Sequence, residues 1–250
     1  MKNVLITGVS KGIGRTIAEK FLREDYCVYG TFFNDKDKAY ELQQQYGDEK
    51  VKLFGPYDFT IIDEIYNFLS EIAAYHFDII VSNAGVFLEN DDFNNFDLNI
   101  FNMTMNCNFY APLILTIGLQ NNINTGGSII IISSNDAYPG AYSSMSYTIS
   151  KSALLSLMKC LSVNSIAPGA IDTDMNTPEQ MNIAPYFTPV SRVGKTFDVA
   201  NVVFFLASDD SAFISGENIT IDGGYNIMSI LLKSEADPSL SDNLQKFIKN

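Results

Sequence analysis

The stretch NVLITGVSKGIGRTIAEKFL, residues 3–22, decides how the chain folds. Its first five residues form an apolar run of strand length. From Ile13 onward, apolar residues recur at intervals of four, which is typical of an amphipathic helix. Between the two lies TGVSKGIG, residues 7–14, whose three glycines allow a tight turn. A strand, a tight turn and a helix in this order predict the first half of a β–α–β unit.

The same alternation of apolar runs and amphipathic stretches continues along the chain. Strands are predicted at residues 3–7, 27–32, 51–57, 78–82, 128–133, 165–167 and 218–222. Strands rich in Val and Ile that alternate with helices predict a doubly wound, Rossmann-type α/β fold, in which helices cover both faces of a parallel sheet. No linker divides the chain, so we predict one domain over residues 1–228 and a polar C-terminal tail over residues 229–250.

Composition argues against several classes of function. The formal charge of −13 opposes binding to nucleic acid, whose phosphates would be repelled. The three cysteines lack metal-binding spacing and the chain has a single histidine, so we predict no metal site. The apolar runs are shorter than the roughly 20 residues that span a bilayer, and the N-terminus lacks the pattern of a signal peptide. We therefore expect a cytoplasmic protein that binds neither membrane nor nucleic acid.

The glycine turn indicates a dinucleotide site. Gly8, Gly12 and Gly14 let backbone N–H groups approach a pyrophosphate at the positive end of the following helix. A glycine cluster by itself could be only a tight turn, but its place between a strand and an amphipathic helix favours the cofactor interpretation.

The residues around the second predicted strand bear on which cofactor binds. NAD-binding proteins usually place an acid at the end of that strand, to bond the ribose 2′-hydroxyl. Here Phe32 or Phe33 occupies that position and Asp35 comes slightly later. Lys11, in the glycine turn, could meet a 2′-phosphate, although it could also be a solvated side chain. The pattern favours NADP(H) over NAD(H).

A second signal is SYTISKSALL, residues 146–155. Tyr147 and Lys151 stand four apart, so a helix would place both on one face. Chance alone predicts about 0.7 Tyr-x-x-x-Lys pairs in a chain of this composition. The chain contains another, Tyr46 with Lys50, so the pair by itself does not identify a site.

The order of motifs resembles that of the short-chain dehydrogenase/reductase family over residues 2–228. Ser134 ends the fifth predicted strand and lies thirteen residues before Tyr147, whereas Tyr46 has no such context. SNAG departs from the family's Asn-Asn-Ala-Gly in having Ser82 first. The matching segments are TGVSKGIG (7–14), YDF (57–59), SNAG (82–85), NFYAP (108–112), IISS (131–134), APGAIDT (167–173) and GENITIDGGY (216–225).

The resemblance implies a catalytic set of Asn108, Ser134, Tyr147 and Lys151, with Asn106 as the competing register for the asparagine. Tyr147 would be general acid in reduction and general base in oxidation. The Lys151 ammonium and the positive nicotinamide ring should lower the pKa of Tyr147 from about 10. Ser134 would hold the carbonyl oxygen, Lys151 would also bond the ribose, and Asn108 would support a chain of waters.

The resemblance also implies which residues bind the cofactor. Asp58 would bond the adenine, and the segment from Pro168 to Thr173 would cover the nicotinamide. The whole set is Gly8, Ser10, Lys11, Gly12, Ile13, Gly14, Asp58, Asn83, Ala84, Gly85, Tyr147, Lys151, Pro168, Gly169 and Thr173.

One departure from the family follows Ser162, where the predicted helix runs straight into VNSIAPG. Roughly nine residues are missing, which would shorten the helix by about 13 Å. Either the deletion is genuine, with a shortened strand and a remodelled surface, or the sequence omits a stretch. The natural fit of both sides to a longer helix and strand favours omission. This helix also builds a subunit interface in the family, so a genuine deletion weakens the expected homo-dimer or homo-tetramer.

Charge bears on which substrate the protein takes. Family members that reduce acyl chains on a carrier protein dock an acidic carrier on a basic patch. The segment QNNINTGG, residues 120–127, contains no basic residue and the net charge is negative. We therefore favour a small-molecule ketone, aldehyde or alcohol over a 3-oxoacyl-carrier-protein. A non-catalytic dinucleotide-binding regulator is the alternative outside enzymes. Within residues 175–195, a lid is predicted, with Met175, Met181, Tyr186 and Phe187 as its apolar contacts, although ordinary packing would explain them equally well.

Overall fold

The computed structural model describes residues 1–88, 94–139 and 144–227. The domain boundary predicted at residue 228 and the tail at 229–250 lie outside the described residues. Among the helices that are described, none has the length and hydropathy needed to cross a membrane.

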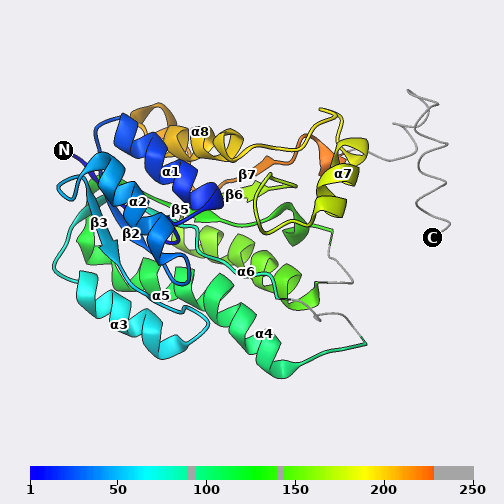
Figure 1. Cartoon of the computed structure of the whole chain (residues 1–250), viewed down its shortest axis with the longest axis horizontal. Helices are drawn as coiled ribbons and strands as arrows, with labels where there is room; N and C mark the ends of the chain where they lie inside the picture. Colours follow the sequence, from blue (N-terminus) through cyan, green and yellow to red (C-terminus); the bar gives the residue numbers. More distant parts are fainter. Residues whose placement is uncertain (89–93, 140–143, 228–250) are drawn as a thin grey trace.

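A single parallel sheet organises the described residues, with seven strands in the order β3-β2-β1-β4-β5-β6-β7 (Figure 1). The strands are β1 Asn3–Ile6, β2 Cys27–Thr31, β3 Val51–Phe54, β4 Phe77–Ser82, β5 Ile123–Ile132, β6 Asn164–Pro168 and β7 Asn218–Ile221. The doubly wound parallel fold predicted from the sequence is confirmed. The strand order reverses between β1 and β4, and ligands bind beyond the carboxyl ends of the strands at such a point.

Helices cover both faces of the sheet. Figure 1 shows α1 and α8 above the sheet and α3, α4 and α5 below it. The helices are α1 Gly12–Arg23, α2 Lys36–Tyr46, α3 Ile62–Ile72, α4 Leu98–Met105, α5 Ala111–Gly118, α6 Met145–Leu161, α7 Pro178–Phe187 and α8 Thr196–Leu206. Short helical turns are the π-helix η1 Asn106–Tyr110 and the 3-10 turns η2 Gln120–Asn122, η3 Asn135–Ala137, η4 Asp209–Ser211 and η5 Tyr225–Ile227.

The core follows from the alternation of side chains along each strand. In β1, Val4 and Ile6 pack in one buried cluster with Phe21 of α1, while Leu5 packs in a second cluster with Phe68 of α3. All five side chains are fully buried. Each large apolar side chain buried in this way contributes about 1.5–3 kcal/mol to stability. Packing on both faces therefore holds the sheet rigid beneath the loops at its carboxyl edge.

The junction between α6 and β6 contradicts the expectation of an omitted stretch. The full sequence has no further residues at this point, so the deletion is genuine. The helix ends at Leu161, and Ser162 adopts the left-handed conformation with φ 55° and ψ 34°. Only Val163 then separates it from the first residue of β6. The left-handed residue turns the chain back at once, which removes the need for a connecting loop.

The deletion shortens β6 relative to its neighbour. Asn164, the first residue of β6, pairs with Ile130, so only the last three residues of the ten-residue β5 have a partner in β6. Ser215 and Ile214 stabilise the junction: the Ser215 hydroxyl donates to the Ser162 carbonyl at 2.8 Å, and the Asn164 amide donates to the Ile214 carbonyl at 2.9 Å. The carboxyl end of β6, which borders the site, keeps its full pairing with β7.

Candidate active site

A cavity of about 740 Å³ opens at the carboxyl ends of the strands. All fifteen residues that the sequence assigned to the cofactor line it. Ser134 lines it too, whereas Asn108 does not. Tyr46 and Lys50 lie elsewhere: Tyr46 ends α2, and the Lys50 ammonium pairs with Asp25 at 2.6 Å. The fold therefore separates the two Tyr-x-x-x-Lys pairs that the sequence could not distinguish by spacing.

The glycine turn forms one end of the cavity and is closely packed. A Cβ on Gly14 would lie 2.0 Å from the Gly8 carbonyl oxygen and 2.4 Å from Nδ2 of Asn83. The Asn83 amide donates to the carbonyls of Thr7 and Gly8 at 2.9 and 3.1 Å. It thereby ties the end of β4 to the turn. Across the cavity, Thr173 lies 3.5 Å from a Cβ placed on Gly12, so the segment after β6 covers the turn.

Charged side chains gather near the start of α2. The Lys11 ammonium lies 2.9 Å from a carboxylate oxygen of Asp35 and 3.8 Å from Asp174, and Lys38 lies 4.0 Å from Asp174. The hydrogen bond from Lys11 lowers the pKa of Asp35. Asp35 lines the cavity despite its late place in the sequence, and so does the exposed Phe33.

Asp58 also lines the cavity. One of its carboxylate oxygens accepts from the backbone N–H and the hydroxyl of Thr60, at 3.0 and 2.7 Å. These bonds fix the orientation of the carboxylate at the start of the loop before α3. The second oxygen is the one that could accept a bond from a ligand.

Ser134, Tyr147 and Lys151 converge at the other end of the cavity. Ser134 follows β5 and caps η3, where its hydroxyl accepts from the backbone N–H of Asp136 at 3.2 Å. Tyr147 and Lys151 come from the first turns of α6. The Lys151 ammonium lies 5.6 Å from the centre of the Tyr147 ring and donates to the Ile132 carbonyl at 2.9 Å.

Burial dominates the titration of this group. It raises the pKa of Tyr147 to about 12, against an opposing hydrogen bond with Ser134, and Asp136 raises it further. Burial also lowers the pKa of Lys151 to about 8. The expectation that Lys151 lowers the pKa of Tyr147 is therefore wrong for the protein's own residues. The ammonium is itself desolvated and bonded to Ile132, so it does not offset the cost of ionising a buried phenol.

Asn108 lies behind the cavity in the π-helix η1 and is fully buried. Its Nδ2 donates to the Val86 carbonyl at 3.0 Å and to the Ser150 hydroxyl at 3.1 Å, and its Oδ1 accepts from the Val86 backbone at 2.8 Å. Asn106, the competing register, donates instead to the Thr60 carbonyl at 2.7 Å. The Asn108 side chain thus joins the loop after β4 to α6. Its position in a π-helix matches the frequent occurrence of such bulges at functional sites.

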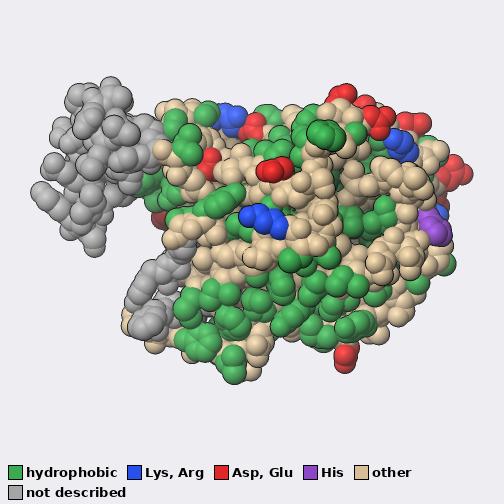
Figure 2. All heavy atoms as spheres, turned by 180° about the vertical axis from the view of Figure 1, so that it is seen from behind, with side chains coloured by type: hydrophobic (Ala, Val, Ile, Leu, Met, Phe, Trp, Pro, Cys, Tyr) green, Lys and Arg blue, Asp and Glu red, His purple; other side chains and the backbone are tan. Residues whose placement is uncertain are grey.

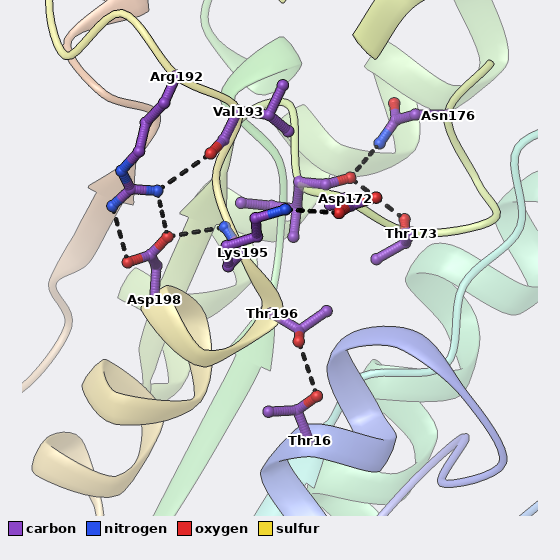
Figure 3. A network of polar contacts seen from close by, with 10 residues as sticks. Thr16, Asp172, Thr173, Asn176, Arg192, Val193, Lys195, Thr196 and Asp198 are labelled. Atoms are coloured by element: carbon purple, nitrogen blue, oxygen red, sulfur yellow. Dashed lines mark hydrogen bonds and ion pairs between the residues drawn. The ribbon is translucent and has the colours of Figure 1, made fainter. Parts of the chain in front are cut away.

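A polar network ties the two ends of the predicted lid together (Figure 3). Arg192 binds Asp198 through two hydrogen bonds of 2.7 and 3.0 Å. Lys195 binds Asp172 at 2.7 Å, so the chain before α8 is joined to the chain after β6 (Figure 3). Backbone bonds between these two segments support the same contact. The lid therefore projects from a closed base.

The lid contributes a different face from the one expected. Met175 and Phe187 line the cavity as predicted, but Met181 and Tyr186 do not. Their places are taken by Gln180, Ile183 and Ala184. The cause is that residues 178–187 form a helix, begun by a Thr177 capping box, so the inward face follows helical spacing. Assigning a helix after Thr177-Pro178 would have identified this face from the sequence.

Sequence reasoning also missed Asp136, Asn176, Phe87 and Tyr225, which line the cavity. Phe87 packs edge-on against the catalytic candidate Tyr147, with ring centres 5.2 Å apart. Asp136 had a usable signal, because it follows Ser134 by two residues. The others lie in irregular segments, and the sequence offers no periodic pattern to place them.

Comparison with known proteins agrees with this geometry. A family model described as enoyl-(acyl carrier protein) reductase matches residues 8–226. The 3-oxoacyl-(acyl-carrier-protein) reductase FabG of Staphylococcus epidermidis is 29% identical, over 89% of this chain and 98% of its own. The L-rhamnose 1-dehydrogenase (NADP(+)) of Thermoplasma acidophilum is also 29% identical, over 89% and 95%. A short chain dehydrogenase from Burkholderia cenocepacia, solved in complex with NADP, is 26% identical, with a TM-score of 0.84 over 90% of this chain and 98% of its own.

Proposed function

The chain belongs to the short-chain dehydrogenase/reductase family of oxidoreductases, and we propose that it transfers hydride between NADP(H) and a small-molecule carbonyl compound or alcohol. One observation carries this proposal. A single cavity is lined both by the glycine turn and by Ser134, Tyr147 and Lys151. The same observation opposes a binding-only regulator, which would have no need to keep these three side chains together beside a cofactor site.

Tyr147 is the proposed proton donor in the reductive direction. When bound, the nicotinamide ring supplies hydride to the carbonyl carbon. The carbonyl oxygen then takes a proton from Tyr147, while the Ser134 hydroxyl bonds that oxygen as its negative charge grows. A pKa raised to about 12 keeps the phenol protonated at neutral pH, which suits this role.

Lys151 and Asn108 are proposed to support the proton donor in different ways. A nearby ammonium favours the phenolate that remains once the proton has left, so Lys151 would reduce part of the cost of proton transfer from Tyr147. In oxidation the same charge, with the positive ring of the bound cofactor, would help Tyr147 act as base. Asn108 acts through structure, because its amide is already bonded to Val86 and Ser150.

The cofactor proposal rests on Lys11. Its ammonium stands in the glycine turn, and Lys38 lies near the same carboxylate of Asp174. These two cations could share a 2′-phosphate. Asp35 competes, because it already pairs with Lys11 and would repel a phosphate. The relatives that name NADP(+) or were solved with NADP support the phosphate-bearing cofactor.

A second candidate, reduction of 3-oxoacyl chains on a carrier protein, is favoured by the similarity to FabG. The net charge of −13 opposes docking of an acidic carrier. We therefore keep the free small molecule as the proposed substrate.

We also propose a homo-oligomer formed through the α4–α5–α6 face. Figure 2 shows hydrophobic side chains gathered over the lower part of the molecule, where α4 and α5 lie. Exposed apolar residues on these helices are Leu98, Met103, Ile117 and Ile149, with Tyr110 of η1 beside them. Because α6 ends early, a second copy would have less of this helix to contact. Light scattering should give two or four times the 27.7 kDa of one chain; a mass of one chain would contradict the proposal.

NADPH oxidation against a panel of ketones, aldehydes and acyl thioesters tests the proposed reaction, with NADH in parallel. The panel includes an acetoacetyl group on free pantetheine and on carrier protein. We expect turnover with free ketones or aldehydes and a preference for NADPH. Preference for the carrier-bound thioester would establish the second candidate instead. Tight NADPH binding with no turnover on any member would favour the regulator.

A further inference from the structure

Asp136 is the carboxylate at the substrate end of the cavity. It belongs to η3, directly after Ser134, and its backbone N–H donates to the Ser134 hydroxyl at 3.2 Å. Its side chain is half-buried and lines the cavity. Its negative charge acts on Tyr147, whose pKa it helps to raise. Asp136 therefore lies within electrostatic range of both groups that would hold the reacting carbonyl oxygen.

The Asp136 carboxylate differs from the other cavity carboxylates in having neither a cation nor a hydrogen-bond donor within the described residues; Asp58, which also lacks a cation, accepts two hydrogen bonds from Thr60. Asp35 and Asp174 both lie within 4.0 Å of a lysine ammonium. No such ion pair and no hydrogen bond to its carboxylate oxygens is found for Asp136 within residues 1–88, 94–139 and 144–227. A half-buried carboxylate that accepts no hydrogen bond carries an uncompensated desolvation free energy. A ligand with a hydrogen-bond donor would offset that free energy on binding.

Neighbouring charged groups do not offset the desolvation cost of the Asp136 carboxylate. Lys151 is the cation at this end of the cavity, and its ammonium is bonded to the Ile132 carbonyl. Lys11 lies at the cofactor end and is paired with Asp35. Tyr147 is a phenol whose ionisation Asp136 opposes. The carboxylate is thus left to interact with what enters the cavity.

We propose that Asp136 determines substrate specificity, by selecting a carbonyl compound with a hydroxyl group on the carbon next to the reacting one. This inference rests on the proposed function. The spacing follows from Asp136 and Ser134 being two residues apart on one tight turn, so a donor to Asp136 lies close to the oxygen held by Ser134. A carboxylate or phosphate at the same position would be repelled.

The rest of the substrate faces a less polar wall. Met175, Ile183, Phe187 and Tyr225 line the cavity near the lid, together with Phe87 beside Tyr147. These side chains suit an apolar or aromatic body on the far side of the carbonyl. A hydroxyketone with an apolar substituent combines both features.

Three aryl ketones of one scaffold test the inference: 2-hydroxyacetophenone, propiophenone and phenylglyoxylate. They place a hydroxyl, a methyl and a carboxylate on the same side of the reacting carbonyl. Each is reduced with NADPH by the wild type, by Asp136→Asn and by Asp210→Asn, which removes an exposed charge in η4. Because the hydroxyketone is intrinsically more reactive, the informative quantity is the change in each kcat/KM between wild type and variant.

A hydrogen bond to a charged group predicts a loss of about 10- to 100-fold for the hydroxyketone in Asp136→Asn. We expect propiophenone to change by less than about threefold and phenylglyoxylate to improve, since a repulsion is removed. Asp210→Asn should behave as wild type. Equal losses for all three ketones would show a structural role and overturn the inference. Asp136→Ser provides the same comparison if the amide variant does not fold.

Other outcomes separate this inference from the proposed function. The wild type could fail to reduce all three ketones and still reduce other members of the carbonyl panel in a reaction that requires Tyr147. In that case the specificity proposal fails and the reductase proposal stands. If nothing is reduced although NADPH binds, the reductase proposal fails, and the specificity proposal fails with it.

Discussion

Replacing Gly14 by alanine should weaken cofactor binding, although alanine has the higher helix propensity. Gly14 is the third residue of α1, where alanine alone would favour the helix by about 1 kcal/mol. The added Cβ, however, would lie 2.0 Å from the Gly8 carbonyl oxygen and 2.4 Å from the Asn83 amide. Ordinary contact begins at 3.4 Å, so the turn must move by more than about 1 Å. Overpacking of this kind costs about 1–3 kcal/mol.

The displaced atoms are those that shape the pyrophosphate site, so the cost appears in binding. We expect the Kd for NADPH to rise at least about tenfold for Gly14→Ala, as measured by calorimetric titration. Gly47→Ala is the matched control: its φ of +90° is strained for alanine, but no atom lies within 4 Å of the new Cβ. It should lose about 1–3 kcal/mol of stability and leave the Kd unchanged. An unchanged Kd for Gly14→Ala would refute this account of the turn.

Three further outcomes are expected. Asp35→Asn should lower the Kd for NADPH about fivefold while that for NADH changes less, because Lys11 is freed and a repulsive charge is removed; equal changes in parallel titrations would contradict this. Ser162→Gly should raise the free energy of unfolding by about 1 kcal/mol in urea titrations, because glycine adopts the left-handed conformation without strain, and a loss of stability would contradict the α6–β6 junction. Lys151→Met should remove a rise in stability between pH 8 and pH 10.5: the folded pKa of about 8 lies below the ordinary 10.5, so in that range the unfolded chain binds more protons and higher pH favours folding.

Local pattern was enough to predict the sheet and most of the cavity. A buried strand followed by a glycine turn and an amphipathic helix is encoded within residues 3–22, and each later strand repeats the same signal. Parallel strands bring their carboxyl ends to one edge, so Ser134 and the segment after Pro168 had to meet the glycine turn. Tyr147 and Lys151 were identified through the resemblance to the short-chain dehydrogenase/reductase family, because spacing alone did not distinguish them from Tyr46 and Lys50.

Features that depend on tertiary surroundings could not be predicted. Several elements together bury Tyr147, and the sequence does not show how much each one covers. The direction in which its pKa shifts was therefore missed. The left-handed Ser162 leaves no mark in the sequence, because serine rarely adopts that conformation, and the genuine deletion was taken for an omission. The Lys11–Asp35 contact joins two loops that sequence patterns treat separately.

We propose that Tyr147 protonates the substrate and that Tyr46, the other tyrosine with the Tyr-x-x-x-Lys spacing, takes no part in the reaction. The most direct test is the rate of NADPH oxidation, with the best carbonyl of the panel, by Tyr147→Phe beside Tyr46→Phe. Loss of a general acid predicts a fall in kcat of about 10²- to 10⁴-fold for the first variant, with NADPH binding retained. Tyr46→Phe, altered at the end of α2 and away from the cavity, should match wild type. Turnover by Tyr147→Phe within a few-fold of wild type would contradict the account.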